Sequence, residues 1–445
     1  MGRYDLADQR AFAARQPVFA LPDAVAVVAL TGPDALRLVS ALTTLPPGLE
    51  PGDGGAEALL LDGQGHIVFA LMVARAGDGL VLLTDGSGEA LAELLNSRRF
   101  RLRAAAEARP DLRVLVTPAP PSDRQSTAPP GGQPPPAQLD GPGPTTPPGG
   151  QPPAVEPGGP AARGSRTPAD DPAPARPRNP LAALSAHCAL RDDWPLPPTS
   201  AERARVGRRG HVYPRYALGA DHPGSAWTGL TSHIYDPGAA SPLPDRLARR
   251  GHRQIDAAVL EGLRIAAWRP LAGREAADGK TLPHELDWLR STTPMNSGCY
   301  PGQETVAKIV NLGRPPRRLV FLHLDGSEAA LPEPGAEVQA PAEPQAPGGV
   351  PGDQLAADQP DGIGGWQVVG RVTSAAVHHE LGPIALALVK RSLPSDAGLA
   401  VAAGAPGGLV AASQTVIVPP SGESDARPAT HKLPIRPRRP TPTEI

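Results

Sequence analysis

The residues best suited to chemistry lie in the segment 296–304, which reads N-S-G-C-Y-P-G-Q-E. Its thiol, Cys299, stands between two glycines, Gly298 and Gly302, and close to a phenol, an amide and a carboxylate, those of Tyr300, Gln303 and Glu304. Glycine has no Cβ, so it allows unusual backbone angles and the close approach of a ligand or strand, while Pro301 stiffens the turn. The segment predicts a tight loop that presents a functional thiol to a cavity.

A basic segment follows this loop and contains Lys308, Arg314, Arg317 and Arg318. Arginine offers a planar fork of donors that matches a carboxylate or a phosphate. Two prolines within the segment keep it extended, so its side chains do not all lie along one helix face. The segment predicts an anion-binding site, and the alternative is an ordinary solvated surface.

Other sequence patterns that resemble metal-binding, catalytic or nucleotide-binding motifs lack the residues or the structural context that these motifs need. His284-Glu285 opens like a zinc-protease motif, but Trp288 takes the place of the second histidine. The run His378-His379-Glu380 lacks a partner pair, and G-I-G-G at 362–365 does not lead from a strand into a helix. Neither a G-x-S-x-G motif nor a P-loop occurs. We therefore expect no metal site and no catalytic triad, and we expect Cys188 to be a structural residue.

Composition narrows the class of protein. The chain has 445 residues and a formal net charge of −2, so no global field favours nucleic acid or membrane, and we expect no direct nucleic-acid binding. Two cysteines suit a reducing compartment. No apolar run reaches the roughly 18 residues of a spanning helix, and no secretory signal is evident. These features predict a cytoplasmic protein without a membrane partner.

Hydrophobic periodicity predicts short strands mixed with helices. Strands are expected at 24–30, 58–61, 67–73, 80–83, 112–116, 319–324, 368–374, 384–389 and 414–418. Helices are expected at 87–95 and 253–267, with a short helical turn at 282–289. The D-G-Q-G sequence at 62–65 predicts a hairpin turn. Strands and helices mixed with hairpins predict an α+β fold, and the last strands predict a small β-barrel.

Two stretches rich in proline and glycine interrupt this pattern. They cannot bury enough apolar surface to offset the entropy of ordering, so we expect disordered insertions. The predicted organisation is an N-terminal part of one domain at 1–117, an insertion at 118–180, the second part of the domain at 181–318, a barrel at 319–418 with a low-complexity insertion at 328–365, and a disordered tail at 419–445.

The segment 298–304 resembles the signature K-G-C-[FY]-x-G-Q-E of the YgfZ folate-binding proteins, relatives of the glycine cleavage system aminomethyltransferase (T protein, GcvT). Other matching words are L-T-G-P-D at 30–34, D-G-Q-G at 62–65, L-P-H-E-L-D-W-L at 282–289 and V-G-R-V-T-S at 369–374. Ser297 stands where the family has lysine, which removes a cation that would lower the pKa of the neighbouring thiol.

The resemblance implies a GcvT-like folate-binding module with a C-terminal barrel, and tetrahydrofolate or another folate as ligand. In T proteins a glutamate pairs with the pterin; here Ala266 takes its place, and Trp268 or Glu285 would have to compensate. Some relatives carry aromatic residues against the ligand where this chain has Val25 and Leu260. The anion site at Lys308, Arg314, Arg317 and Arg318 would then hold the glutamate tail of folate or RNA phosphate.

The function implied by the resemblance is support of iron–sulfur cluster assembly or repair, and through it iron–sulfur-dependent tRNA modification. Its partners would be iron–sulfur enzymes or assembly factors. One alternative is an enzyme, a tetrahydrofolate-dependent aminomethyltransferase, which needs a carboxylate at the pterin and another at the reacting amine. The other alternative is an interaction scaffold that has lost its ligand.

Overall fold

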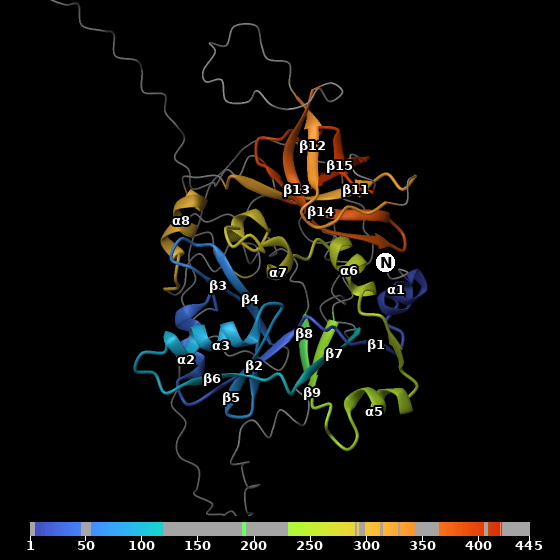
Figure 1. Cartoon of the computed structure of the whole chain (residues 1–445). Helices are drawn as coiled ribbons and strands as arrows, with labels where there is room; N and C mark the ends of the chain where they lie inside the picture. Colours follow the sequence, from blue (N-terminus) through green and yellow to red (C-terminus); the bar gives the residue numbers. More distant parts are fainter. Residues whose placement is uncertain are drawn as a thin grey trace, which may run out of the picture. The chain divides into compact units, whose positions relative to one another are not determined.

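A computed structural model describes residues 5–45, 55–118, 189–192, 230–289, 292, 299–311, 315–327, 330–342, 365–404, 408–418 and 420. All of these belong to one compact unit. The unit contains two five-stranded sheets, several short helices and a closed barrel (Figure 1). The α+β class predicted from the sequence is confirmed.

The first sheet has the strand order β3 (Ala56–Leu61), β4 (Ile67–Ala76), β5 (Gly79–Thr84), β2 (Ala26–Thr31) and β6 (Ala105–Ala108), with all neighbours antiparallel. Helices α2 (Ala35–Leu42) and α3 (Gly88–Ser97) bury their apolar stripes in the same core as this sheet. Ser87 caps α3 by accepting a hydrogen bond from the backbone of Ala90. The sheet offers the end of β5 to the site described below.

The second sheet has the order β10 (Arg253–Ile255), β1 (Val18–Ala20), β7 (Arg113–Pro118), β9 (Leu230–Tyr235) and β8 (Ala189–Asp192). Helix α1 (Leu6–Ala13) packs on its core, and α5 (Leu243–Arg249) contacts β10. The helix expected at 253–267 is wrong in its first turn, because β10 pairs in parallel with β1. The side chain of Asp256 then accepts a hydrogen bond from the backbone of Ala258, which starts the helix late.

Four short helical segments follow β10: α6 (Val259–Ala266), α7 (Ala272–Glu275), the 3₁₀ turn η6 (Pro283–Glu285) and α8 (Gln303–Asn311). Helix α6 contacts the barrel strands β13 and β14, and α7 contacts both these strands and β4 of the first sheet (Figure 1). Helices α6 and α7 therefore connect the sheets with the barrel.

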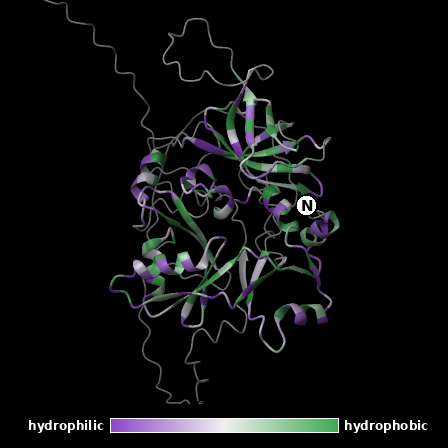
Figure 2. Ribbon diagram, in the orientation of Figure 1, coloured by the Kyte–Doolittle hydropathy of each residue, from purple (hydrophilic) through white to green (hydrophobic). Residues whose placement is uncertain are grey.

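The barrel closes in the order β11 (Arg317–Leu324), β14 (Gly382–Lys390), β13 (Trp366–His378), β12 (Glu337–Pro341), β15 (Leu399–Ala402) and β16 (Leu409–Val416). Hydrophobic residues predominate along the strands, whereas α5 and α8 carry many hydrophilic residues (Figure 2). The predicted barrel is confirmed. The low-complexity insertion expected at 328–365 is too long, because β12 lies inside it and closes the barrel between β13 and β15.

Several expectations fall on residues outside the described ranges. These are the insertion at 118–180 beyond Pro118, Cys188, the loop residues Ser297 and Gly298, the cation Arg314, and the tail beyond Pro420.

Candidate functional site

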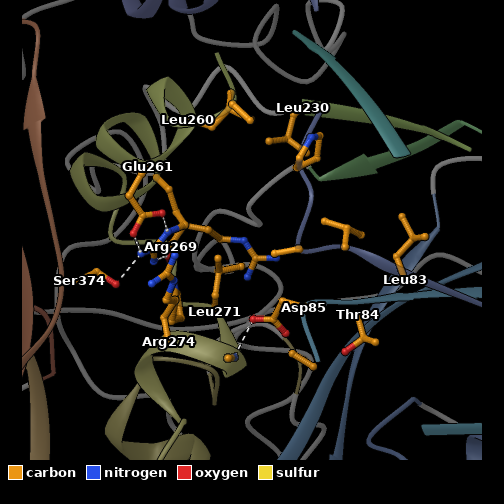
Figure 3. A pocket seen from close by; sticks show the side chains of 18 of the residues that line it. Leu83, Thr84, Asp85, Leu230, Leu260, Glu261, Arg269, Leu271, Arg274 and Ser374 are labelled. Carbon is orange, nitrogen blue, oxygen red and sulfur yellow. Dashed lines mark hydrogen bonds and ion pairs between the residues drawn. The ribbon is translucent and has the colours of Figure 1, made fainter. Parts of the chain in front are cut away.

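A cavity of about 830 Å³ lies where the two sheets, helices α6 and α7 and the barrel strand β13 meet (Figure 3). Much of its wall is aliphatic, with Val25, Met72, Leu83, Leu230, Leu260 and Leu271 among the lining residues. Small-molecule sites commonly combine such a wall with a few placed polar groups, in cavities of about 300 to 1,000 Å³. The polar groups of this cavity decide which ligand it suits.

One buried polar group of the cavity is the Arg264 guanidinium on α6, whose side chain is 6% exposed. It donates to Glu261 Oε1 at 2.6 Å, to Glu275 Oε2 at 3.1 Å and to Ser374 Oγ of β13 at 2.7 Å. Burial would lower the pKa of Arg264, but the two carboxylates outweigh it and the pKa is raised. Arg264 is therefore a permanently charged structural link between α6, α7 and the barrel.

Two carboxylates of the cavity wall are held by arginines. Burial would raise the pKa of Glu261, yet the neighbouring Arg264 charge prevails and the pKa is lowered. Glu57 of β3 pairs with Arg269 at 2.6 Å. Both carboxylates are therefore committed to ion pairs.

Asp85 is different. It follows β5 directly and its Oδ2 accepts a hydrogen bond from the backbone N–H of Gly273, at 2.7 Å (Figure 3). No described cationic side chain forms an ion pair with it. Burial raises the pKa of Asp85, although the Gly273 hydrogen bond opposes this. Asp85 is thus a carboxylate in the cavity wall with acceptor capacity left for a ligand.

One cation of the cavity wall is also open to a ligand. Arg274 on α7 is exposed and makes no ion pair with a described residue. It lies on the same side of the cavity as Asp85, on the helix whose Gly273 binds that carboxylate (Figure 3). Sequence reasoning missed Asp85, Arg274 and Arg264. The visible signals were an acid between a strand and a helix N-cap, and the Glu261–Arg264 spacing of three residues on one helix face.

The motif loop lies away from this cavity. Cys299 is exposed and is not among the residues that line it. Tyr300 is buried with Trp268 and Trp288 in the core, and this burial raises the pKa of its phenol to about 12. Gln303 is half-buried at the start of α8, and Glu304 and Lys308 are exposed on that helix. The loop therefore presents its thiol to solvent while its tyrosine anchors it.

Gly302 fixes the position of this loop. Its φ is +76°, and a Cβ added to it would lie 2.5 Å from the carbonyl oxygen of Asp62 and 2.6 Å from the Cα of Gly65. Asp62 and Gly65 belong to the D-G-Q-G turn between β3 and β4, which forms as predicted: Asp62 Oδ1 accepts hydrogen bonds from the backbone N–H groups of Gln64 and His66. The two most distinctive sequence motifs of the chain thus pack backbone against backbone.

The described arginines of the basic segment separate onto two sides of β11. Arg317 pairs with Glu285 at 2.9 Å and with Asp278 at 2.6 Å. Arg318 is buried and donates to Leu393 O and Gln414 Oε1, and burial lowers its pKa to about 10. The structure does not bring Arg317, Arg318 and Lys308 together at the cavity. A joint anion site for them stays a prediction.

The structure also places Ala266, which stands where T proteins have the pterin-pairing glutamate, and the two residues expected to compensate for it. Ala266 packs against the hydrophobic core and does not line the cavity, and Trp268 lies in that core. Glu285 is committed to Arg317. Val25 and Leu260, where relatives carry aromatic residues, do line the cavity. Asp85 is therefore a better candidate for pairing with a ligand than either expected substitute.

The described residues contain no group of three or more His, Cys, Asp or Glu side chains arranged to hold a metal ion. Within the same ranges, no helix has the length and apolar character needed to cross a membrane.

The chain is similar in structure to the glycine cleavage system aminomethyltransferase T from Bartonella henselae, with 14% sequence identity, a TM-score of 0.53, and 95% of this chain and 90% of that chain covered. No family model and no curated protein matches the sequence. The predicted GcvT-like fold is confirmed, and the YgfZ assignment stays a prediction.

Proposed function

We propose that the protein binds a reduced folate in the 830 Å³ cavity. The observation that carries the proposal is Asp85, a carboxylate of the cavity wall that forms no ion pair with a described side chain and whose pKa is raised by burial, although the charge of Arg269 opposes this. The 2-amino-4-oxo-pyrimidine edge of a pterin offers two adjacent N–H donors, which suit a carboxylate. Arg274, next to the Gly273 that binds Asp85, offers a fork of donors to an acceptor of the ligand on that side of the cavity. The aliphatic part of the wall suits the flat pterin and the aminobenzoyl ring.

Asp85→Asn should weaken tetrahydrofolate binding by about 10- to 100-fold, because a hydrogen bond to a charged group contributes about 1.5–3 kcal/mol. Isothermal titration calorimetry with tetrahydrofolate measures this. The control is Asp78→Asn, which changes an exposed aspartate outside the cavity. Equal affinity of both variants and the parent would remove Asp85 from the site, and no binding by the parent would support the scaffold alternative.

The same variant has a second expected effect, on stability. Since the pKa of Asp85 is raised in the folded state, its contribution to stability is present below the unfolded pKa and is lost as pH rises through the raised value. Asp85→Asn keeps a side-chain oxygen that accepts the hydrogen bond from the Gly273 N–H. Because asparagine does not ionise, the variant does not lose stability as the pH rises. The variant should therefore be as stable as the parent or more stable at neutral pH in thermal denaturation, which separates weakened binding from unfolding.

The aminomethyltransferase alternative rests on the T-protein fold, and it requires a second carboxylate at the reacting amine. Of the other carboxylates in the cavity wall, Glu57 and Glu261 are committed to arginines, and Asp23 and Glu333 are exposed side chains. The described wall thus holds no second buried carboxylate outside an ion pair, which favours binding without turnover. Transfer of a one-carbon unit from an aminomethyl donor to tetrahydrofolate, measured as formation of methylenetetrahydrofolate, would favour the enzyme instead.

Within the folate-binding class, we propose a role of the YgfZ type, in which the exposed Cys299 thiol supports iron–sulfur enzymes. Cys299→Ala should reduce the activity of an iron–sulfur tRNA-modifying enzyme several-fold in a strain that depends on this protein, with folate affinity unchanged because the thiol lies outside the cavity wall. Cys188→Ala is the matched control, since it removes the chain's other cysteine. If the activity of the tRNA-modifying enzyme is unchanged with Cys299→Ala, the proposed role of the thiol is excluded. The folate-binding proposal is not affected by that result.

A further inference from the structure

The turn between α3 and β6 carries an arginine-rich, aromatic surface that the folate site does not use. Its sequence from 97 to 103 is S-R-R-F-R-L-R. The backbone N–H of Leu102 bonds to the carbonyl of Arg99 at 2.9 Å, so Phe100 and Arg101 form the two corners of a tight turn. Phe100 is 90% exposed, the most exposed large hydrophobic residue among those described.

The backbone of Phe100 is unfavourable for its residue type. Its φ is +49°, a left-handed conformation that glycine or asparagine adopts readily and a bulky aromatic residue rarely does. Strain of this kind clusters at active sites, ligand clamps and switch regions. Here the strained residue gains no burial, since its ring stands in solvent while its neighbour Leu102 packs on the core. The fold alone does not account for a phenylalanine at this corner.

The arginines around Phe100 fall into two groups. Arg99 donates to the carbonyl of Ala104 and Arg103 pairs with Asp34, so these two hold the turn. Arg98 and Arg101 are exposed and make no ion pair with a described residue. The two arginines that the turn does not use are Arg101, directly after Phe100, and Arg98, two residues before it.

We propose that this turn, residues 97–103, binds single-stranded nucleic acid, with a base stacked on Phe100 and phosphates held by Arg98 and Arg101. Aromatic rings stack on any base, and guanidinium forks match phosphate oxygens. A membrane surface fits less well, because a single exposed ring offers little apolar area for insertion. The prediction of no nucleic-acid binding was based on the net charge of −2 of the whole chain, which does not reveal a local basic patch.

The test is fluorescence anisotropy with labelled 15-nucleotide oligo(U) and oligo(dT). Phe100→Ala should weaken binding about tenfold, as loss of one stacked base typically does, and Phe100→Trp should restore it. Arg98→Gln/Arg101→Gln should reduce the slope of log K against log salt by about 1.4, two phosphate contacts at about 0.7 each for a single strand. The matched control, Arg246→Gln/Arg250→Gln, removes two exposed arginines at α5 and should leave the slope unchanged.

Phe100→Gly keeps the test independent of folding. Glycine accepts the positive φ, so this variant should unfold at the same or a higher temperature while it binds the oligonucleotides as weakly as Phe100→Ala. Three results would overturn the proposal: equal binding by Phe100→Ala and the parent, equal losses in the α5 control, or binding only to vesicles that contain phosphatidylglycerol. Folate titration of the same variants should be unchanged, because residues 97–103 do not line the cavity.

Discussion

Arg264→Leu is expected to lower the free energy of unfolding by about 3–5 kcal/mol, the usual cost of removing one partner from a buried ion pair. The Glu275 side chain is 0% exposed, so it would be left as a bare charge in the interior. Glu275 does keep hydrogen bonds from the backbone of Leu271 and from Ser374, but no other cation is bonded to it among the described residues. Urea unfolding followed by tryptophan fluorescence measures the change.

Two further variants show whether charge is the cause. Arg264→Leu/Glu275→Gln removes the bare charge while keeping an acceptor oxygen, so it should recover part of the loss. Arg371→Leu breaks an ion pair whose partners are 62% and 41% exposed, and should cost at most about 1 kcal/mol. If the single variant Arg264→Leu costs no more than Arg371→Leu, the link between α6, α7 and the barrel does not depend on this ion pair.

Local patterns were sufficient for most of the strands. The apolar run at 67–73 and the D-G-Q-G turn predicted the β3–β4 hairpin, because both depend on residues that are close in sequence. Strand β10 was missed because its three residues continue a helical pattern, and only pairing with β1 makes them a strand. Strand β12 was missed for a related reason, since its proline- and alanine-rich sequence is extended only between β13 and β15. Long-range pairing was the missing information in both cases.

The site was less predictable than the fold. Val25 and Leu260 were identified through the family resemblance and do line the cavity. Asp85 could not be distinguished from other turn aspartates, because its raised pKa arises from burial by segments distant in sequence, including Gly273. Arg317 and Arg318 looked equivalent in the sequence, yet adjacent residues of a strand face opposite sides, so one meets Glu285 and the other enters the barrel. The sequence shows that both residues are arginines, but the strand register determines which partner each side chain contacts.

Gly302→Ala should cost about 3 kcal/mol or more of unfolding free energy, for two reasons that add. A φ of +76° is strained for alanine, and the new Cβ would meet backbone atoms of Asp62 and Gly65 that cannot rotate away. The expected consequence goes beyond stability, because the contact is what holds the loop of Cys299 against the β3–β4 hairpin. Alkylation of the thiol should therefore become faster in this variant under conditions where the rest of the chain stays folded.

Substitutions at two other glycines separate the contribution of backbone strain from that of the steric clash. Gly279 has a φ of +65° and open space around it, so Gly279→Ala should show the backbone strain alone, about 1 kcal/mol. Gly63, in the hairpin turn itself, has no neighbour within 4 Å, so Gly63→Ala should change stability by about 0.5 kcal/mol or less. A loss at Gly302 no larger than that at Gly279 would mean that the hairpin yields to the added methyl group. Gly302 would then be needed for its positive φ and not for its close packing against the hairpin.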